Sequence, residues 1–456
     1  MGKGLTVVRS LQRKHMLDSW VREHVQTSLQ GIAEKARQDG KYRFYDVYRL
    51  INEEMLLVAW SEINKNAASG VDRVTAVEYE ENLIDNIRDL VLRLKEKRYK
   101  AKLVRRVYIP KSDGRQRPLG IPALEEKLVQ SAATRILNAI YEQDFLSCSF
   151  GYRPKVGPLD AVKDITDTLF WGKYTYIVEA DIKGFYDNID HDWMIRMLEQ
   201  RINDRAFLNL IRKWLKAGVL DTDGKIIHPA TGVPQGGIIS PILSNIYLHY
   251  ALDLWMEKVV KPRCEGEAYL CRYADDFICA FRYKADADRF YEALGGRLGK
   301  FGLELAKDKT RIIRFTRFRK EEKAYFEFLG FEFRWAVDRK GRDLIKRRTS
   351  RKRLRKSIRT FKEWVRKNRS WRLRKLFWKL NAKLRGYYNY YGIIGNARSL
   401  KEFFELAWKI LYKWLNRRSQ RRSFNMKGFV QVCEHYRIDK PRITEKRYRQ
   451  LKLALS

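Results

Sequence analysis

Cysteine, long apolar runs and acidic side chains are all scarce in this chain of 456 residues. The five cysteines are odd in number and show no C-x-x-C spacing. This pattern argues against a disulfide framework and against a zinc module, and it fits a reducing cytosol. No apolar run reaches about 18 residues, so we expect no membrane-spanning helix.

Positive charge is the largest compositional bias. The chain has 94 Lys and Arg against 55 Asp and Glu, which gives a formal net charge of +39. Such an excess implies a polyanionic partner, either nucleic acid or an anionic membrane surface. The membrane surface is disfavoured, because no basic amphipathic helix has a continuous apolar face outside the expected core. We therefore expect nucleic acid as the partner.

Two adjacent carboxylates lie at the tip of an expected β-hairpin over residues 269–281. Runs rich in Tyr, Phe and Ile flank a short polar tip that carries Asp275 and Asp276. The pair is either an acidic surface turn or part of a cation site, since hard cations such as Mg²⁺ prefer oxygen ligands. A cation site needs a third carboxylate, and Asp181 supplies a candidate at the end of a strand-like run. Three such carboxylates can clamp two metal ions about 4 Å apart for phosphoryl transfer.

A second punctuated segment lies between these carboxylates. Residues 232–241 read Gly-Val-Pro-Gln-Gly-Gly-Ile-Ile-Ser-Pro. Gly and Pro at this density indicate a backbone that approaches another group closely.

The motifs resemble those of a known family. Tyr-Ala-Asp-Asp at residues 273–276 resembles the signature of reverse transcriptases, and Asp181 stands where that family keeps its first metal ligand. The Pro-Gln-Gly segment resembles the nucleotide-site loop of the same family, and the blocks follow the family's order. Residues 339–422 resemble the maturase domain of group II intron proteins, which separates this chain from retroviral enzymes.

The resemblance implies roles for five further residues at a nucleotide site. Lys111 and Arg117 would hold the triphosphate of the incoming nucleotide. Tyr186 would lie against its sugar, exclude a 2′-hydroxyl and so select deoxyribonucleotides. Gln235 would lie beside the sugar and base, and Lys309 would contact a phosphate.

Two of these roles have plainer alternatives. The expected basic hairpin over residues 103–122 is also readable as a solvated edge. Tyr186 is also interpretable as a core aromatic, and Phe185 competes for its role.

The segment from residue 339 to residue 422 carries thirty Lys and Arg against four acidic residues. Its apolar residues recur at helical spacing, which predicts a folded helical domain instead of a disordered tail. We expect a second helix to begin at a capping box of Ser399 and Glu402, and the aromatic run 386–392 to lie between the helices. Basic faces with interleaved aromatics suit RNA, although most of these rings are expected to be packing residues of a bundle.

The resemblance covers nearly the whole chain and implies an α+β fold: a right-hand polymerase with fingers and palm, followed by a helical thumb or maturase domain. The expected divisions are an N-terminal extension and fingers over 1–172, a palm over 173–336, a basic thumb or maturase domain over 337–422 and a short basic segment over 423–456. Many relatives carry an endonuclease with Cys pairs and His in the last part. Only Cys433 and His435 occur here, so we expect no HNH endonuclease.

The implied function is that of a group II intron reverse transcriptase, an RNA-directed DNA polymerase. A primer 3′-hydroxyl would attack the α-phosphate under two Mg²⁺ held by Asp181, Asp275 and Asp276. The implied partners are intron RNA, an RNA template with primer, a DNA target and deoxynucleoside triphosphates, in a bacterial cytoplasm. The protein would also assist splicing and retrohoming.

Two other functions remain open at this point. One is an RNA-binding splicing cofactor with little polymerase activity. The complete set of acidic and nucleotide-site residues argues against it, because a binder has no need of them. The other is a domesticated repair polymerase without an intron partner.

Overall fold

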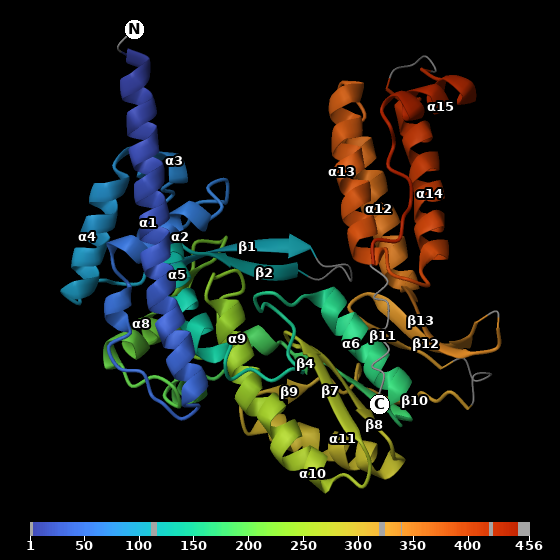
Figure 1. Ribbon diagram of the computed structural model, residues 1–456, viewed down its shortest axis with the longest axis horizontal. Helices are drawn as coiled ribbons and strands as arrows, with labels where there is room; N and C mark the ends of the chain where they lie inside the picture. Colours follow the sequence, from blue (N-terminus) through green and yellow to red (C-terminus); the bar gives the residue numbers. More distant parts are fainter. Residues whose placement is uncertain (1–2, 111–115, 319–323, 339, 419–422, 446–456) are drawn as a thin grey trace, which may run out of the picture. The chain divides into compact units, whose positions relative to one another are not determined.

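The protein is described by a computed structural model, and it divides into two compact units. The described residues are 3–110, 116–318, 324–338, 340–418 and 423–445, with the backbone alone for 3–20. Unit 1 comprises Met1–Ala161 and Val178–Arg311, and unit 2 comprises Val162–Ile177 and Ile312–Ser456. Both contain helices and strands (Figure 1). Among the described helices, none combines the length and the apolar character needed to cross a membrane.

Unit 1 begins with helices. They are α1 (Lys3–Gln38), η1 (Tyr48–Leu50), α2 (Glu53–Glu62), α3 (Ala76–Glu81) and α4 (Leu83–Lys95). Helix α4 shows the physical reason. Ile87, Leu90, Val91 and Leu94 recur at helical spacing and are all buried, so one face of the helix joins the core.

The expected basic hairpin is confirmed by β1 (Val104–Pro110) and β2 (Gln116–Ile121), which pair antiparallel. Its turn lies outside the described residues, and so does Lys111. Strand β1 also pairs parallel with β5 (Val219–Leu220), and β5 pairs with β6 (Ile226–Ile227). The sheet order is β2-β1-β5-β6.

A second sheet, of order β10-β3-β8-β7, carries the acidic residues. Its strands are β3 (Tyr176–Ala180), β7 (Ala268–Tyr273), β8 (Asp276–Phe281) and β10 (Arg311–Arg314). Strands β7 and β8 pair antiparallel from Ala268 opposite Phe281 to Tyr273 opposite Asp276, which confirms the expected hairpin. Residues 277–281 of β8 are all buried, so the strand is anchored in the core up to the acidic tip.

The other helices and short elements between residues 124 and 305 follow in chain order. They are α5 (Leu124–Tyr141), α6 (Pro158–Trp171), β4 (Ile182–Lys183), η2 (Phe185–Asp187), α7 (His191–Leu198), α8 (Arg205–Leu215), α9 (Ser240–Leu248), α10 (Lys261–Arg263), α11 (Lys284–Gly299) and β9 (Glu304–Leu305). Two π-helical turns follow α9 in the chain, η3 (His249–Asp253) and η4 (Met256–Val260). Such turns widen a helix by one residue and redirect its side chains.

Unit 2 combines a three-stranded antiparallel sheet with a helical bundle (Figure 1). The strands are β11 (Phe326–Phe328), β12 (Phe331–Val337) and β13 (Asp343–Thr349), and the helices are α12 (Arg351–Asn368), α13 (Leu373–Tyr391), α14 (Ala397–Leu415) and α15 (Met426–His435). Aromatic and aliphatic side chains of the four helices share one core. The expected helical character of the basic segment is thus confirmed.

Two local predictions in unit 2 were wrong. The aromatic run from Gly386 is the last part of α13, not a connection between helices. Burial of Tyr388 and stacking of Tyr387 on Phe403, with ring centroids 3.7 Å apart, outweigh the low helix propensity of glycine.

The second correction concerns the start of α14. Its N-cap is Asn396, so Ser399 lies inside the helix and forms no capping box with Glu402. Asn396 is buried and bonds the backbone and hydroxyl of Thr349 at 2.9 Å each. A contact with a distant strand therefore decides where this helix begins.

Candidate active site

The acidic tip lies at the turn between β7 and β8. Ala274 and Asp275 form the turn, and Asp276 is the first residue of β8. Ala274 has a φ of +57°, a left-handed conformation that is unfavourable for a residue with a Cβ. Asp275 is half-buried, whereas Asp276 is exposed. The two neighbouring carboxylates therefore stand in different environments.

Asp181 lies close enough to Asp275 for their charges to interact. It directly follows β3, the neighbour of β8 in the sheet. Burial raises the pKa of Asp275 above its ordinary value of 3.8, and the negative charge of Asp181 raises it further. Two like charges that are partly desolvated attract any cation placed between them.

Lys309 provides such a cation. Its ammonium group forms an ion pair with the Asp181 carboxylate. The backbone holds the two segments in register, since the Ala306 N–H donates to the Asp181 carbonyl at 2.8 Å. Lys309 thus lies at the acidic site, while the predicted phosphate contact stays a prediction.

Arg117 and Gln235 meet at the same region of unit 1. The Arg117 Nε donates to Gln235 Oε1 at 2.8 Å. The charge of Arg117 also lowers the pKa of Asp275, which places the guanidinium within electrostatic range of the acidic turn. Gly236 explains the close packing: at φ +111°, a Cβ there would lie 2.6 Å from the carbonyl oxygen of Gly120. The predicted close approach of the Pro-Gln-Gly backbone is therefore confirmed.

Tyr186 is buried, and its hydroxyl lies 3.5 Å from Ser244 Oγ. Together with Gln235 it lines a cleft of about 420 Å³. Phe185 is also buried and does not line that cleft. Of the two aromatics, Tyr186 is the one that can contact a molecule bound there.

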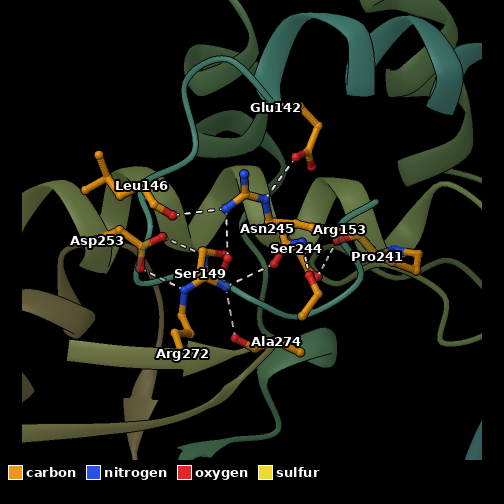
Figure 2. A network of polar contacts seen from close by, with 11 residues as sticks. Glu142, Leu146, Ser149, Arg153, Pro241, Ser244, Asn245, Asp253, Arg272 and Ala274 are labelled. Atoms are coloured by element: carbon orange, nitrogen blue, oxygen red, sulfur yellow. Dashed lines mark hydrogen bonds and ion pairs between the residues drawn. The ribbon is translucent and has the colours of Figure 1, made fainter. Parts of the chain in front are cut away.

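Sequence reasoning missed Arg272, a residue of β7 that is completely buried. Figure 2 shows its guanidinium at the centre of a polar network. All five N–H groups have an acceptor: both carboxylate oxygens of Asp253, Asn245 Oδ1, Ser149 Oγ and the carbonyl of Ala274. A charged residue inside an otherwise apolar strand was the signal that could have pointed to it.

The acidic residues fit a divalent cation by their chemistry. In the described part of the chain, no three His, Cys, Asp or Glu side chains form a preformed metal site. The Asp181–Asp275 pair nevertheless offers the hard oxygen donors that Mg²⁺ prefers, and its mutual repulsion favours a bound cation. Asp276 adds a third carboxylate at the next position.

Comparison with known proteins agrees with this geometry. Residues 109–333 match the family described as reverse transcriptase (RNA-dependent DNA polymerase). Residues 351–430 match the maturase-specific domain of group II introns. The region that carries the acidic turn and the nucleotide loop is therefore an RNA-directed DNA polymerase domain, a class whose members typically depend on a divalent metal ion.

Individual relatives lead to the same family. Protein YkfC of Escherichia coli is 31% identical over 315 residues, which cover 62% of this chain and 82% of that protein. The group II intron-encoded protein LtrA of Lactococcus lactis is 29% identical over 463 residues, covering 82% of this chain and 75% of the relative. An uncharacterised 91 kDa protein in a cob intron of Schizosaccharomyces pombe is 38% identical over 210 residues, which cover 46% of this chain and 26% of that protein. The chain belongs to the group II intron reverse transcriptase and maturase family.

The family assignment confirms the resemblance drawn from the motifs. It also confirms an α+β reverse transcriptase domain followed by a helical maturase domain. A maturase-specific domain implies that the chain binds intron RNA.

Proposed function

We propose that this protein copies RNA into DNA by two-metal nucleotidyl transfer, and that it binds the intron RNA to assist splicing and retrohoming. The observation that carries the proposal is the gathering of Asp181, Asp275, Arg117 and Lys309 in one region of unit 1, where Arg117 also bonds Gln235. Two carboxylates beside two cationic side chains match a reaction in which a cation and a polyphosphate meet.

In this proposal Asp181, Asp275 and Asp276 hold Mg²⁺. The ions would activate the primer 3′-hydroxyl and stabilise the leaving oxygen. Lys309, which pairs with Asp181, contributes positive charge beside the phosphates. Lys111 and Arg117 hold the triphosphate, and Arg117 at the same time orients the Gln235 side chain.

Tyr186 sets the sugar specificity. Its ring is held by burial, and its hydroxyl lies near Ser244 at the limit of hydrogen-bond distance. A ring fixed in this way cannot move aside for a 2′-hydroxyl, so ribonucleotides would clash while deoxyribonucleotides bind. Steric exclusion by a fixed ring needs no polar contact with the sugar.

The proposed organisation is that of a right-hand polymerase. It has an N-terminal extension and fingers over 1–172, a palm over 173–336, a thumb or maturase domain over 337–422 and a basic segment over 423–456. The paired strands β7 and β8, which carry the acidic turn, support the palm, and the paired strands β1 and β2 support the fingers. The proposed boundary at 336 falls within β12, so the three-stranded sheet contributes to both the palm and the thumb.

The RNA-binding part of the proposal is supported by α12. One face carries the buried residues Leu354, Phe361 and Val365. The same helix exposes nine basic side chains: Arg351, Lys352, Arg353, Arg355, Lys356, Arg359, Lys362, Arg366 and Lys367. A basic face on a rigid helix suits the phosphates of intron RNA, and of a template–primer duplex or DNA target.

Primer extension on an RNA template, with Mg²⁺ and deoxynucleotides, tests the polymerase directly. Wild type is compared with Asp275→Ala and with Asp288→Ala, which removes only an exposed ion pair to Lys284 on α11. We expect extension by wild type and Asp288→Ala and none by Asp275→Ala. If a folded wild type binds RNA but extends nothing, the protein is a splicing cofactor instead.

A further inference from the structure

The turn that carries Asp275 and Asp276 is hydrogen-bonded by the side chain of Arg272, which is not among the predicted metal ligands. Ala274 takes an unfavourable left-handed conformation just before these two residues. Its carbonyl accepts a hydrogen bond from Nη1 of Arg272 at 3.1 Å. Arg272 is the last residue but one of β7, so the bond closes the turn onto its own strand.

A second branch of the network runs through Asn245 to the backbone of Gly151, which packs against the same turn. Nη1 of Arg272 also donates to Asn245 Oδ1 at 3.0 Å, and Nδ2 of Asn245 donates to the Gly151 carbonyl at 2.6 Å. Gly151 lies so close to the turn that a Cβ on it would collide with the backbone nitrogen of Ala274. The guanidinium therefore bonds the turn directly and the Gly151 backbone through Asn245. Figure 2 shows its bonds to Ala274 and Asn245.

The edge of the guanidinium formed by Nε and Nη2 pairs with a buried carboxylate. Nε and Nη2 donate to the two carboxylate oxygens of Asp253 at 2.7 and 2.5 Å. Asp253 is itself buried, at the end of the π-helical turn η3 that follows α9. Ser149 Oγ takes the remaining N–H at 2.7 Å, and the Phe150 N–H and the Cys148 carbonyl bond the backbone of Arg272.

Stability alone is a weak reason for such an arrangement. Burying an ion pair costs desolvation that the mutual attraction only balances, and apolar residues of similar volume often do as well. A planar fork with five fixed acceptors, however, defines the position of each acceptor in a way that apolar packing does not.

We propose that Arg272 is a positioning residue, which holds the Ala274–Asp275 turn so that the carboxylates of Asp275 and Asp276 face Asp181. The inference rests on the proposed function, since it takes these carboxylates as the metal ligands. It adds that their geometry is set by a network spanning β7, α9, η3 and the segment before Gly151.

The test measures Mn²⁺ binding to the full chain without nucleic acid, by electron paramagnetic resonance of the unbound ion. Arg272→Lys keeps the charge but loses the fork that serves five acceptors. The matched control is Arg201→Lys: Arg201 is also buried and paired, with Asp144 at 3.0 Å, and it touches none of the site residues. Groups that orient metal ligands typically change affinity by about 10- to 100-fold when replaced.

We expect Mn²⁺ to bind Arg272→Lys about 10- to 100-fold more weakly than wild type, while Arg201→Lys binds like wild type. High Mg²⁺ should partly restore primer extension by Arg272→Lys, because the ligands are displaced and not removed. Unchanged Mn²⁺ affinity in a folded Arg272→Lys protein overturns the proposal, and so does an equal loss in Arg201→Lys.

A second variant keeps the test decisive if Arg272→Lys fails to fold. Asn245→Ala removes the arm to Gly151 and leaves the Asp253 pair in place, and we expect it to weaken Mn²⁺ binding several-fold. No change in Asn245→Ala would then overturn the proposal. Failure of the polymerase assignment would look different: wild type would extend no primer, yet Mn²⁺ affinity would still depend on Arg272.

Discussion

Unit 1 buries Arg272 completely, whereas unit 2 leaves most of the Arg and Lys side chains of α12 exposed. The buried guanidinium satisfies five acceptors from four segments of the chain. The exposed cations of α12 surround a helix whose other face packs through Leu354, Phe361 and Val365. A buried cation can fix the positions of its acceptors, while exposed cations attract a polyanion. We therefore propose that the two units use the same kinds of side chain for different purposes.

The largest expected effect is a loss of primer extension when the acidic site of unit 1 is changed. Asp181→Asn removes a charge that interacts with both Asp275 and Lys309. Loss of metal stabilisation of several kcal/mol should lower the rate of primer extension roughly 10³-fold. RNA affinity, measured by filter binding, should stay at the wild-type value. A comparable loss in Asp288→Asn would show that the effect is not specific to the site.

Acid should lower the folding stability of the protein through His249, a buried residue of unit 1. Burial lowers the pKa of His249, which lies near Asp253 and Arg272, from 6.5 to about 4. The unfolded chain then binds more protons than the folded one between these values, so stability falls as pH decreases from about 6.5 to about 4. The full loss would be about 3 kcal/mol.

The measurement is denaturant unfolding of wild type and His249→Gln across this pH range. The stability difference between the two should change with pH, with wild type losing more towards pH 4. If the unfolding free energies of the two proteins change with pH in parallel, His249 does not cause the loss of stability in acid.

Neutralising the basic face of α12 should act on affinity alone. Arg355, Arg359 and Arg366 are exposed. Replacing all three by Gln should weaken RNA binding and lower the slope of log affinity against log salt by about 2 to 3. Titrations at several salt concentrations measure both. An unchanged slope would show that this face does not contact phosphates.

Sugar selection should depend on the ring of Tyr186 and not on its hydroxyl. Tyr186→Ala opens the cleft and should reduce discrimination against ribonucleotides about 10-fold or more, the scale of a steric preference in a binding pocket. Tyr186→Phe keeps the ring and loses only the long contact with Ser244, so its discrimination should match wild type. The ratio of kcat/KM for paired nucleotides is the readout. Equal loss in both variants would assign the selection to the hydroxyl.

The smallest predicted effect lies in unit 2. Gly386 is an exposed residue inside α13, and a Cβ there would meet nothing within 4 Å. Gly386→Ala should therefore stabilise the bundle by about 0.5 to 1 kcal/mol through the better helix propensity of alanine. Denaturant unfolding measures the gain. A loss of stability would mean that the helix does not extend through this residue.

Local patterns predicted the hairpin of Asp275 and Asp276 and the helical character of the basic segment, because apolar strand runs and helical spacing depend on neighbours in the sequence. The start of α14 could not be predicted in this way. Ser399 and Glu402 have the spacing of a capping box, but Asn396 is held by Thr349 on a distant strand. Tertiary contacts override a local signal of this kind.

The candidate site shows the same division. Short motifs pointed to Asp181, Asp275 and Gln235, and the family resemblance added Arg117. The structure brings these side chains together. Arg272 could not be found from a motif, since its acceptors come from segments far apart in the chain. The ion pair of Lys309 with Asp181 likewise needed the fold.

One crossed measurement tests the central claim, that unit 1 performs the chemistry and α12 of unit 2 provides RNA affinity. Primer extension at saturating RNA template and equilibrium binding of intron RNA are measured for wild type, Asp275→Ala and the triple α12 variant. Asp275→Ala should lose extension and keep RNA affinity, while the α12 variant should lose affinity and keep the extension rate at saturation. If Asp275→Ala loses RNA affinity, or extends at the wild-type rate, unit 1 and α12 do not divide chemistry and RNA binding in this way.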